Sequence, residues 1–252
     1  MIEVFILSLI QGITEFLPIS SSSHLILISN FFNFENENLS IDVSLHIGSF
    51  FAVVFYFNKD LVDFYNNKIL FLKILISSIP VIAVGFFLVK SNYIDNLRDM
   101  KIIAWTTIIF GILLFISDKS KVKNDIKKNF NLKSALIIGL LQICSLCPGV
   151  SRSGIAITAA RFLKFKRVDA AKISFLISIP ILGAVSIYGL SSIILTESKN
   201  LSLINVVAIL FSFIFSFITI KYFLKFLKKF NLSLFVIYRV ILGSILLLVY
   251  YL

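Results

Sequence analysis

Long apolar runs separated by short charged segments restrict this chain to one class of fold. Of its 252 residues, 58% are hydrophobic and only 15% are charged, and the mean hydropathy is +0.98. Soluble domains carry about 25% charged residues, and a helix needs roughly 18 or more apolar residues to cross a bilayer. We therefore expect an all-α polytopic membrane protein. The expected spans lie at about 43–57, 70–89, 101–117, 173–193, 203–222 and 233–252.

Basic residues are concentrated between these runs. In a soluble protein the formal net charge of +11 would suggest a nucleic-acid partner, whereas lysines in the loops of a membrane protein set its orientation. We therefore expect membrane lipids as neighbours and no nucleic acid. The lysine-rich segment 119–133 is the strongest cytoplasmic signal. It divides a single membrane domain, 1–252, into two halves, 1–118 and 134–252.

Two other apolar stretches are interrupted, and their pieces are too short to span a membrane. The first covers 2–32 and is broken at Pro18; the second covers 135–163 and is broken at Pro148-Gly149. Proline ends a helix, and the serines after each break are good caps for a new one. Non-helical backbone survives at membrane depth only where it lines a cavity or packs on protein. We expect two re-entrant helix hairpins, with a kinked transmembrane helix as the plainer alternative.

Each half would then consist of one hairpin and three transmembrane helices. Because three spans change the side of the membrane, the first hairpin would enter from outside and the second from the cytoplasm. This is an inverted-topology repeat, whose sites lie near the midplane where the broken elements meet. The segments 58–68 and 164–172 would be loops at the cytoplasmic side. Glu35, Glu37 and Asp42 make the loop after the first hairpin acidic.

The polar residues at the two breaks form a set suited to binding a phosphate. Gln11 and Glu15 are four residues apart and share a helix face. Hydroxyl and N–H groups at a helix start can face an anion, and arginine binds phosphate oxygens in pairs. Charged groups within a membrane are costly and need a partner or a function. The candidate site residues are Gln11, Glu15, Ser20, Ser21, Ser22, His24, Ser151, Arg152, Ser153 and Gly154.

This inventory suits phosphoryl transfer. A serine could attack, His24 could take or give a proton, and Arg152 could stabilise the equatorial phosphate oxygens. Glu15 could bind a divalent cation or orient His24. Two alternatives stay open. A buried Glu–Arg pair can be purely structural, and broken helices in an inverted repeat are also typical of transporters, here a lipid translocator.

Other hydrolase classes fit less well. An acid-phosphatase type of enzyme would need a second histidine after Ser151-Arg152, and none follows. Two histidines and two cysteines make a zinc site implausible. Cys144 and Cys147 are expected to pack as small hydrophobic residues.

At these residues the chain resembles the undecaprenyl-diphosphate phosphatase family of bacterial inner membranes, also called bacitracin-resistance proteins. The family carries an (E/Q)-x-x-x-E-F-L-P-(V/I)-S-S-x-x-H motif and a P-G-x-S-R-S-G-x-T motif. Weaker similarities lie at 42–48, 174–180 and 238–243, so the resemblance covers the whole chain. The first motif is matched by Gln11, Glu15, Pro18, Ser20, Ser21 and His24, and the second by Pro148, Gly149, Ser151, Arg152, Ser153 and Gly154.

The resemblance implies hydrolysis of undecaprenyl diphosphate to undecaprenyl phosphate and inorganic phosphate. This reaction recycles the carrier lipid for cell-wall synthesis and gives bacitracin resistance. It also implies a multi-pass protein of the bacterial inner membrane with its site facing the outer side, and it allows a homodimer.

The resemblance also implies roles for the site residues. Ser21 is the nucleophile candidate, assisted by Glu15 and His24, and Arg152 binds phosphate. A divalent cation, Mg²⁺ or Ca²⁺, is required, with Glu15 and Gln11 as its candidate ligands. The expected substrate-binding residues are Gln11, Ser20, Ser22, Ser151, Ser153 and Gly154.

The sequence departs from the family pattern at two positions. Ala156 stands where the second motif has threonine, so Thr158 or Ser153 would have to supply the missing hydroxyl. Ser23 stands where glycine is common before the histidine. The only other histidine, His46, is expected to pack at the edge of a span.

Overall fold

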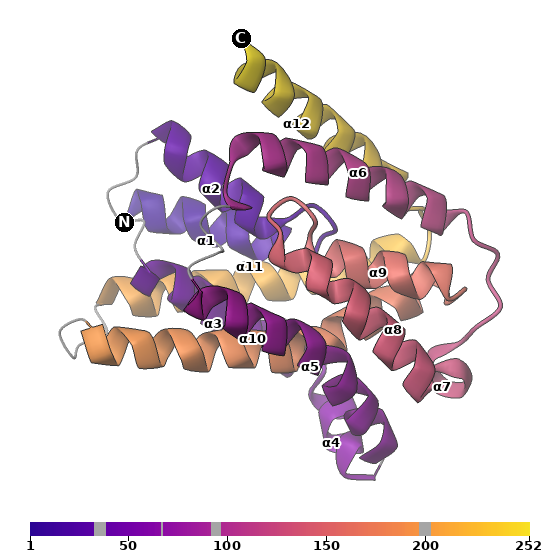
Figure 1. The fold of residues 1–252 in the computed structure, drawn as a ribbon. Helices are drawn as coiled ribbons and strands as arrows, with labels where there is room; N and C mark the ends of the chain where they lie inside the picture. Colours follow the sequence, from indigo (N-terminus) through magenta and orange to yellow (C-terminus); the bar gives the residue numbers. More distant parts are fainter. Residues whose placement is uncertain (33–38, 67, 92–96, 197–202) are drawn as a thin grey trace.

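Six long apolar helices form the body of the protein in a computed structural model that describes residues 1–32, 39–66, 68–91, 97–196 and 203–252 (Figure 1). Each is long and apolar enough to cross a membrane, as the sequence predicts. The named elements in the described ranges are all helices, so the protein is an all-α polytopic membrane protein. The six are α3 (Leu39–Tyr56), α5 (Lys68–Lys90), α6 (Met100–Asp118), α10 (Arg167–Thr196), α11 (Leu203–Leu227) and α12 (Ser233–Tyr251).

Two segments expected to be loops are partly helical. Helix α10 already begins at Arg167, so much of 164–172 is helical, and α10 continues through Pro180. Segment 58–68 contains a short helix, α4 (Asn58–Asn66). The two helices are joined because Lys172 Nζ donates to Asp60 at 2.5 Å. The predicted acidic residues Glu35 and Glu37 lie outside the described residues.

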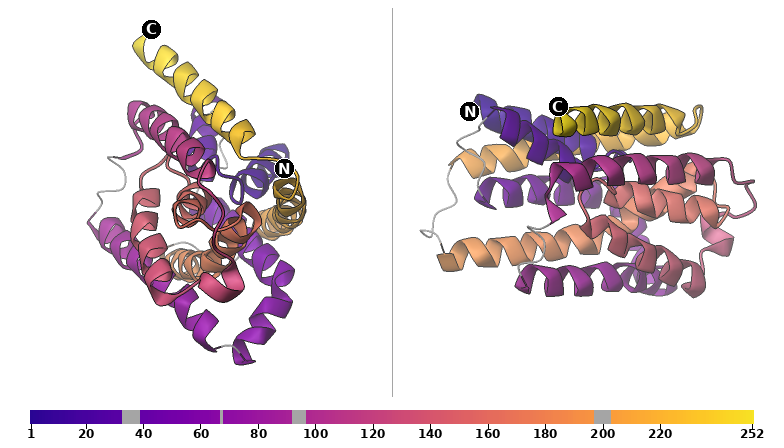
Figure 2. Two further views of the ribbon diagram at one scale, coloured as in Figure 1. Left: turned by 90° about the vertical axis from the view of Figure 1, so that its right-hand side faces the viewer. Right: turned by 45° about the horizontal axis from the view of Figure 1, so that its top comes forward.

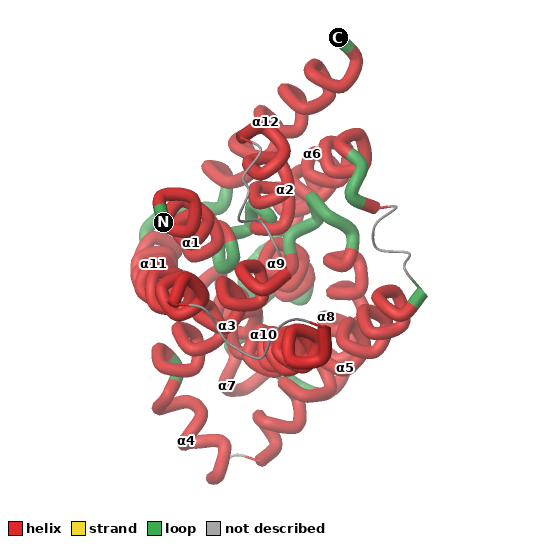
Figure 3. Tube along the Cα trace, turned by 90° about the vertical axis from the view of Figure 1, so that its left-hand side faces the viewer, coloured by secondary structure: helices red, strands yellow, loops and turns green. Residues whose placement is uncertain are grey.

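Four shorter helices make up the two interrupted stretches. They are α1 (Ile2–Thr14), α2 (Ser21–Phe32), α8 (Leu132–Gln142) and α9 (Arg152–Phe162), and a 3₁₀ turn, Ile143–Leu146, extends α8. At 1.5 Å per residue each covers about 16–20 Å, roughly half to two thirds of a hydrocarbon core. Helix α1 contacts α2, and α8 contacts α9, so the two pieces of each stretch pack together, and their re-entry into the membrane stays a prediction. Loop segments accordingly lie among the helices near α2 and α9 (Figure 3).

The lysine-rich segment is not a free linker. It contains the short helix α7 (Ile126–Asn129) and packs on the end of the second hairpin. The N–H groups of Lys123 and Asn124 both donate to the Lys164 carbonyl, and Arg161 donates to the carbonyls of Asp118 and Ser120. These contacts gather the basic segments at one end of the bundle, opposite the N-terminus (Figures 1 and 2).

The two hairpins pack reciprocally on helices of the other half. Helix α1 lies on α11, and α8 lies on α5. A glycine allows the close approach in each case, since Gly12 faces the backbone of Ser216 and Gly139 faces the backbone of Ser77. An inverted repeat would produce this exchange, and the repeat itself stays a prediction.

Candidate functional site

The two breaks share one local conformation. Helix α1 ends at Thr14, and α2 starts directly after Ser20, whose φ is +72°. Helix α9 starts directly after Ser151, also at φ +72°, and its hydroxyl caps the helix by accepting the Gly154 N–H at 3.1 Å. A positive φ is unusual for a residue with a side chain and is typical of functional sites. Both chain reversals therefore end on a serine that starts the returning helix.

The two breaks contact each other directly, as the sequence predicts. Arg152 Nη2 lies 2.7 Å from Glu15 Oε1. The Ser153 hydroxyl donates to the Leu17 carbonyl at 2.7 Å, and the Gly149 N–H donates to Ser20 Oγ at 3.3 Å. These bonds join residues about 130 positions apart in the chain, so the junction depends on how the whole bundle packs.

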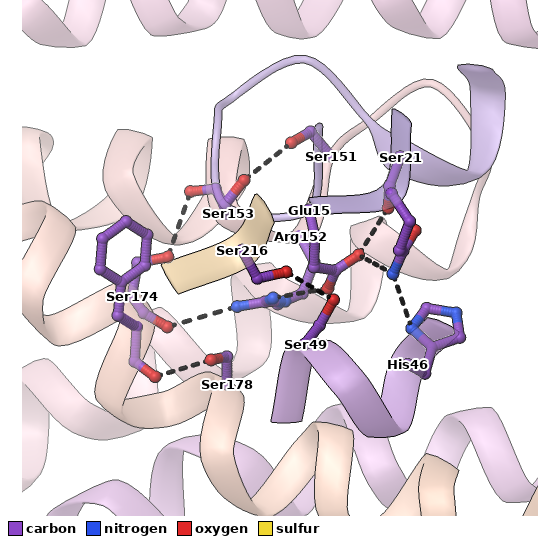
Figure 4. A network of polar contacts seen from close by, with 12 residues as sticks. Glu15, Ser21, His46, Ser49, Ser151, Arg152, Ser153, Ser174, Ser178 and Ser216 are labelled. Atoms are coloured by element: carbon purple, nitrogen blue, oxygen red, sulfur yellow. Dashed lines mark hydrogen bonds and ion pairs between the residues drawn. The ribbon is translucent and has the colours of Figure 1, made fainter. Parts of the chain in front are cut away.

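Glu15 is the centre of the polar network shown in Figure 4. Its Oε1 atom accepts from Arg152, and its Oε2 atom accepts from the Ser21 hydroxyl at 2.6 Å and from Gln11 Nε2 at 3.1 Å. Arg152 also reaches the Ser174 carbonyl at 3.4 Å. A serine hydroxyl that donates to a carboxylate has a base in place to accept its proton.

A cavity of about 200 Å³ opens beside this network. Its lining combines the hydroxyl, carboxylate and guanidinium groups of both breaks with apolar side chains from α5 and α10. An apolar groove of about 290 Å³ between α5 and α10 shares Val81, Leu146, Ile181 and Val185 with it. The polar cavity thus adjoins the apolar groove. The cavity lining is Glu15, Ser20, Ser21, Ser22, His46, Val81, Ser145, Leu146, Ser151, Arg152, Ile181, Leu182 and Val185.

His46 lies at this site, although the sequence suggested that it packs at the edge of a span. It projects from α3 into the cavity lining, and its Nδ1 atom lies 3.1 Å from Gln11 Nε2 (Figure 4). The weak family similarity over 42–48 was the one sequence signal that pointed to it.

His24 lies elsewhere. It does not line the cavity, and both of its ring nitrogens have partners. Nδ1 lies 2.6 Å from the Ser20 carbonyl oxygen, and Nε2 lies 2.5 Å from the Tyr238 hydroxyl of α12. The predicted proton-transfer role of His24 stays a prediction. In this arrangement the side chain fixes the start of α2.

The other predicted residues outside the cavity lining have structural partners. Gln11 contacts Glu15, as described, and the Ser153 hydroxyl is held by Leu17 and lies 3.2 Å from Ser151 Oγ. Gly154 lies in the first turn of α9. Ala156 is fully buried in the apolar core, away from the cavity lining. Of the cysteines, Cys147 is half-buried but Cys144 is exposed, so the expected burial is wrong for Cys144.

Arg239 is the main residue that the sequence analysis did not select. This α12 side chain is fully buried, and its guanidinium donates only to backbone carbonyls. Nη1 binds the carbonyls of Pro18 and Val150, both at 3.1 Å, and Nη2 binds that of Gly149 at 2.8 Å. Arg239 therefore links the first break to the second by hydrogen bonds, and it lies outside the cavity lining.

Glu15 and Gln11 are the candidate ligands of a divalent cation at this site. Gln11 Oε1 is buried and has no hydrogen-bond partner in the described part of the chain, and it belongs to a side chain bonded to Glu15. A carboxylate and an amide oxygen are the hard ligands that Mg²⁺ and Ca²⁺ prefer. Among the described residues no three His, Cys, Asp or Glu side chains form a cluster, so further ligands from outside the chain would have to complete the coordination.

Six helices of spanning length, an arginine–carboxylate–serine cluster and an adjoining apolar groove define the class. This is a polytopic membrane protein with a polar cavity beside an apolar groove. The family model described as "Bacitracin resistance protein BacA" matches residues 4–245, and the chain belongs to that family.

Curated relatives span nearly the full chain. The chain is 48% identical over 251 residues to an undecaprenyl-diphosphatase of Pelagibacter ubique (strain HTCC1062), covering 99% of this chain and 98% of the relative. It is 38% identical over 262 residues to the protein of the same name from Jannaschia sp. (strain CCS1), covering 98% of each. Identity to the Saccharophagus degradans protein of that name is 42% over 252 residues, covering 94% of each.

Proposed function

We propose that this protein is an integral membrane phosphatase that hydrolyses undecaprenyl diphosphate to undecaprenyl phosphate and inorganic phosphate. The observation that carries the proposal is the hydroxyl of Ser21 held 2.6 Å from Glu15, whose other oxygen pairs with Arg152 in a cavity lining. The names of the curated relatives support the same substrate. The reaction would recycle the carrier lipid and so give resistance to bacitracin.

The substrate fits the shape of the site. The diphosphate would occupy the polar cavity, where Ser20, Ser22 and Ser151 offer hydroxyl groups. The apolar groove between α5 and α10 would receive the first part of the prenyl chain. Arg152 lines the cavity and pairs with Glu15. When substrate binds, the guanidinium would donate some of its hydrogen bonds to the terminal phosphate oxygens instead of to Glu15.

The chemistry proceeds in two balanced steps. Glu15 takes the Ser21 proton, and Oγ attacks the terminal phosphorus while the bond from that phosphorus to the bridging oxygen breaks. Undecaprenyl phosphate leaves with the bridging oxygen and takes the proton from Glu15, while Arg152 stabilises charge on the equatorial oxygens. The Glu15 carboxylate regenerated in this way then takes a proton from water, whose oxygen attacks the phosphorus of the phosphoserine. The bond from phosphorus to Ser21 Oγ breaks, inorganic phosphate leaves, and Ser21 Oγ recovers its proton from Glu15.

A divalent cation would be held by Glu15 and Gln11, and when bound it would neutralise part of the diphosphate charge. His24 would act by holding the Ser20 carbonyl and hence the start of α2. His46, which lines the cavity, would influence Glu15 through Gln11.

The setting in the cell is part of the same proposal. The basic end of the bundle would face the cytoplasm of a bacterium, because positive loops stay on that side of the inner membrane. The first hairpin would then enter from outside and the second from inside, as an inverted repeat, with the site facing the outer side. A homodimer is compatible with this arrangement.

The test is phosphate release by the purified protein in detergent supplied with undecaprenyl diphosphate. Wild-type protein should release one phosphate per lipid, and Ser21→Ala should abolish the release. Ser145→Ala is the matched control, because Ser145 lines the same cavity but donates to the Gln142 carbonyl at 2.6 Å. Equal activity in wild type and Ser21→Ala would contradict the proposal.

The meeting of two broken elements at the bundle centre also favours a second candidate, translocation of the carrier lipid. Liposomes containing the protein and a headgroup-labelled carrier lipid would separate the two. If Ser21→Ala protein moves the labelled lipid from one leaflet to the other but releases no phosphate, the protein is a translocator.

A further inference from the structure

A second hollow lies away from the cavity and shares none of its lining residues. It has a volume of about 540 Å³ and lies between the end of α1, the second half of α11 and the start of α12. That volume is typical of small-molecule sites. The lining is apolar and aromatic apart from one threonine and two lysines: Ile13, Leu17, Ile218, Thr219, Tyr222, Phe223, Lys225, Phe226, Lys229, Phe230, Leu234 and Phe235. We call it the α11–α12 groove.

The two lysines lie at the basic end of this groove. Lys225 is in the last turn of α11, and Lys229 is the second residue after the helix. Together with Lys221 and Lys228 they also line an adjoining hollow of about 420 Å³. All four lysines are exposed, so the rim of the groove is positive while its floor is apolar.

Part of the positive charge at this end of the bundle is neutralised within the chain. Arg161 and Arg167 pair with Asp118, and Lys172 pairs with Asp60. Within the described ranges no ion pair involves the four lysines on and after α11. Their charge is thus available to a ligand from outside the chain.

We propose that the α11–α12 groove binds an acidic phospholipid of the surrounding membrane. The phosphate would lie between Lys225 and Lys229, and an acyl chain would run along α11 toward Ile218 and Ile13. Seven residues separate Lys225 from Ile218, which corresponds to about 10 Å of helix. Long lysine side chains hold their charge at the headgroup level while their stems cover apolar surface. Basic pockets at the cytoplasmic ends of helices bind acidic headgroups in this way.

Phospholipid fits better than a soluble anion or a protein segment. Ile218 and Tyr222 on α11 and Leu234 on α12 are exposed in the groove, and both helices are of spanning length, so this part of the surface faces acyl chains. The carrier lipid is also an anion on an apolar chain, and the experiment distinguishes it from phospholipid.

The experiment measures bound lipid on the intact protein by native mass spectrometry. Protein is titrated in detergent with phosphatidylglycerol, phosphatidylcholine or undecaprenyl phosphate. The test variant is Lys225→Gln/Lys229→Gln, and the matched control is Lys121→Gln/Lys123→Gln, which removes two exposed charges from the same end of the bundle. A third variant, Ile218→Trp, fills the groove without changing charge.

Wild-type protein should prefer phosphatidylglycerol to phosphatidylcholine. The test pair should reduce the affinity for phosphatidylglycerol about thirtyfold, from roughly fivefold for each lysine. The control pair should leave it within about twofold, and Ile218→Trp should weaken both phospholipids. Equal losses in the test and control pairs would overturn the proposal, and so would stronger binding of undecaprenyl phosphate than of phosphatidylglycerol at this groove.

Discussion

Arg152 and Arg239 both reach the junction of the two breaks, but they have opposite surroundings. Arg152 lines a cavity, is 12% exposed and pairs with the carboxylate of Glu15. Arg239 is fully buried and binds only carbonyl groups, among them those of Pro18, Gly149 and Val150. A carbonyl cannot be displaced by a ligand without breaking the backbone arrangement, whereas a carboxylate partner can be shared with phosphate. One arginine is thus suited to binding a ligand and the other to holding the site in shape.

Removal of the cavity-side arginine should have the largest effect on activity. Arg152→Ala should reduce kcat/KM for undecaprenyl diphosphate by about 10³, the upper part of the range for one charge-stabilising donor. It should also lower stability, because Glu15 is left buried without its partner. Phosphate release and thermal unfolding are measured on the same preparation.

A double variant separates these two effects. Arg152→Met/Glu15→Gln removes both charges, so the unfolding temperature should return toward wild type while activity stays lost. Recovery of activity in the double variant would show that the pair is only structural, and the comparison between the two arginines would fail.

Replacement of the buried arginine should affect stability first. Arg239→Met leaves several carbonyls of both breaks without donors, and we expect a loss of about 3–5 kcal/mol in unfolding free energy. Activity should fall by about 10², because a shift of about 1 Å at the junction is enough to misplace the reacting groups. Arg239→Lys should recover part of the stability, whereas Arg152→Lys should recover part of the activity. If the stability of Arg239→Met equals that of wild type, this side chain does not hold the breaks.

Substitutions of the two histidines should show the same division as substitutions of the two arginines, with smaller effects. A change of His46 should affect activity, and a change of His24 should affect stability. His46→Gln, on the cavity side, should lower kcat about tenfold and change its pH dependence, without a change in unfolding temperature. The factor lies below the 10²–10⁴ of a direct general acid or base, because His46 reaches Glu15 only through Gln11.

His24→Gln, on the Arg239 side, should instead cost about 1 kcal/mol of stability, typical of one hydrogen bond. Tyr238→Phe should cost a similar amount, and the double variant less than the sum of the two, since His24 and Tyr238 share one contact while His24 also contacts the Ser20 carbonyl. A change in the pH dependence of kcat in His24→Gln would restore the proton-transfer role that the family motif assigns to this residue.

The fold was largely predictable from the sequence because apolar runs in a membrane have few alternatives. The sequence analysis located all six spans, and the observed helix ends differ from the expected ones by up to about six residues. The errors fall where polar side chains find partners across the bundle. Lys172 was assigned to a loop, yet it lies in α10 and pairs with Asp60. The segment 119–133 was expected only to divide the two halves, yet it packs on the end of α9 through Lys164 and Arg161.

The site was predictable only where its residues are neighbours in the chain. Glu15 and Ser21, and likewise Ser151 and Arg152, are grouped around the breaks and stand out in apolar sequence. His46 and Arg239 are single polar residues within spans, and their partners lie 35 and up to 221 positions away. Local pattern carries no information about such contacts, because they form only when the helices pack.

The most direct test of the central claim is to identify the group that receives phosphate. Protein mixed with substrate labelled in its terminal phosphate is quenched in acid within one turnover, digested and mapped by mass spectrometry. The account predicts labelled phosphate on Ser21 in wild-type protein and none in Ser21→Ala. Turnover without any labelled peptide, or label on a residue outside the junction of the two breaks, would contradict it.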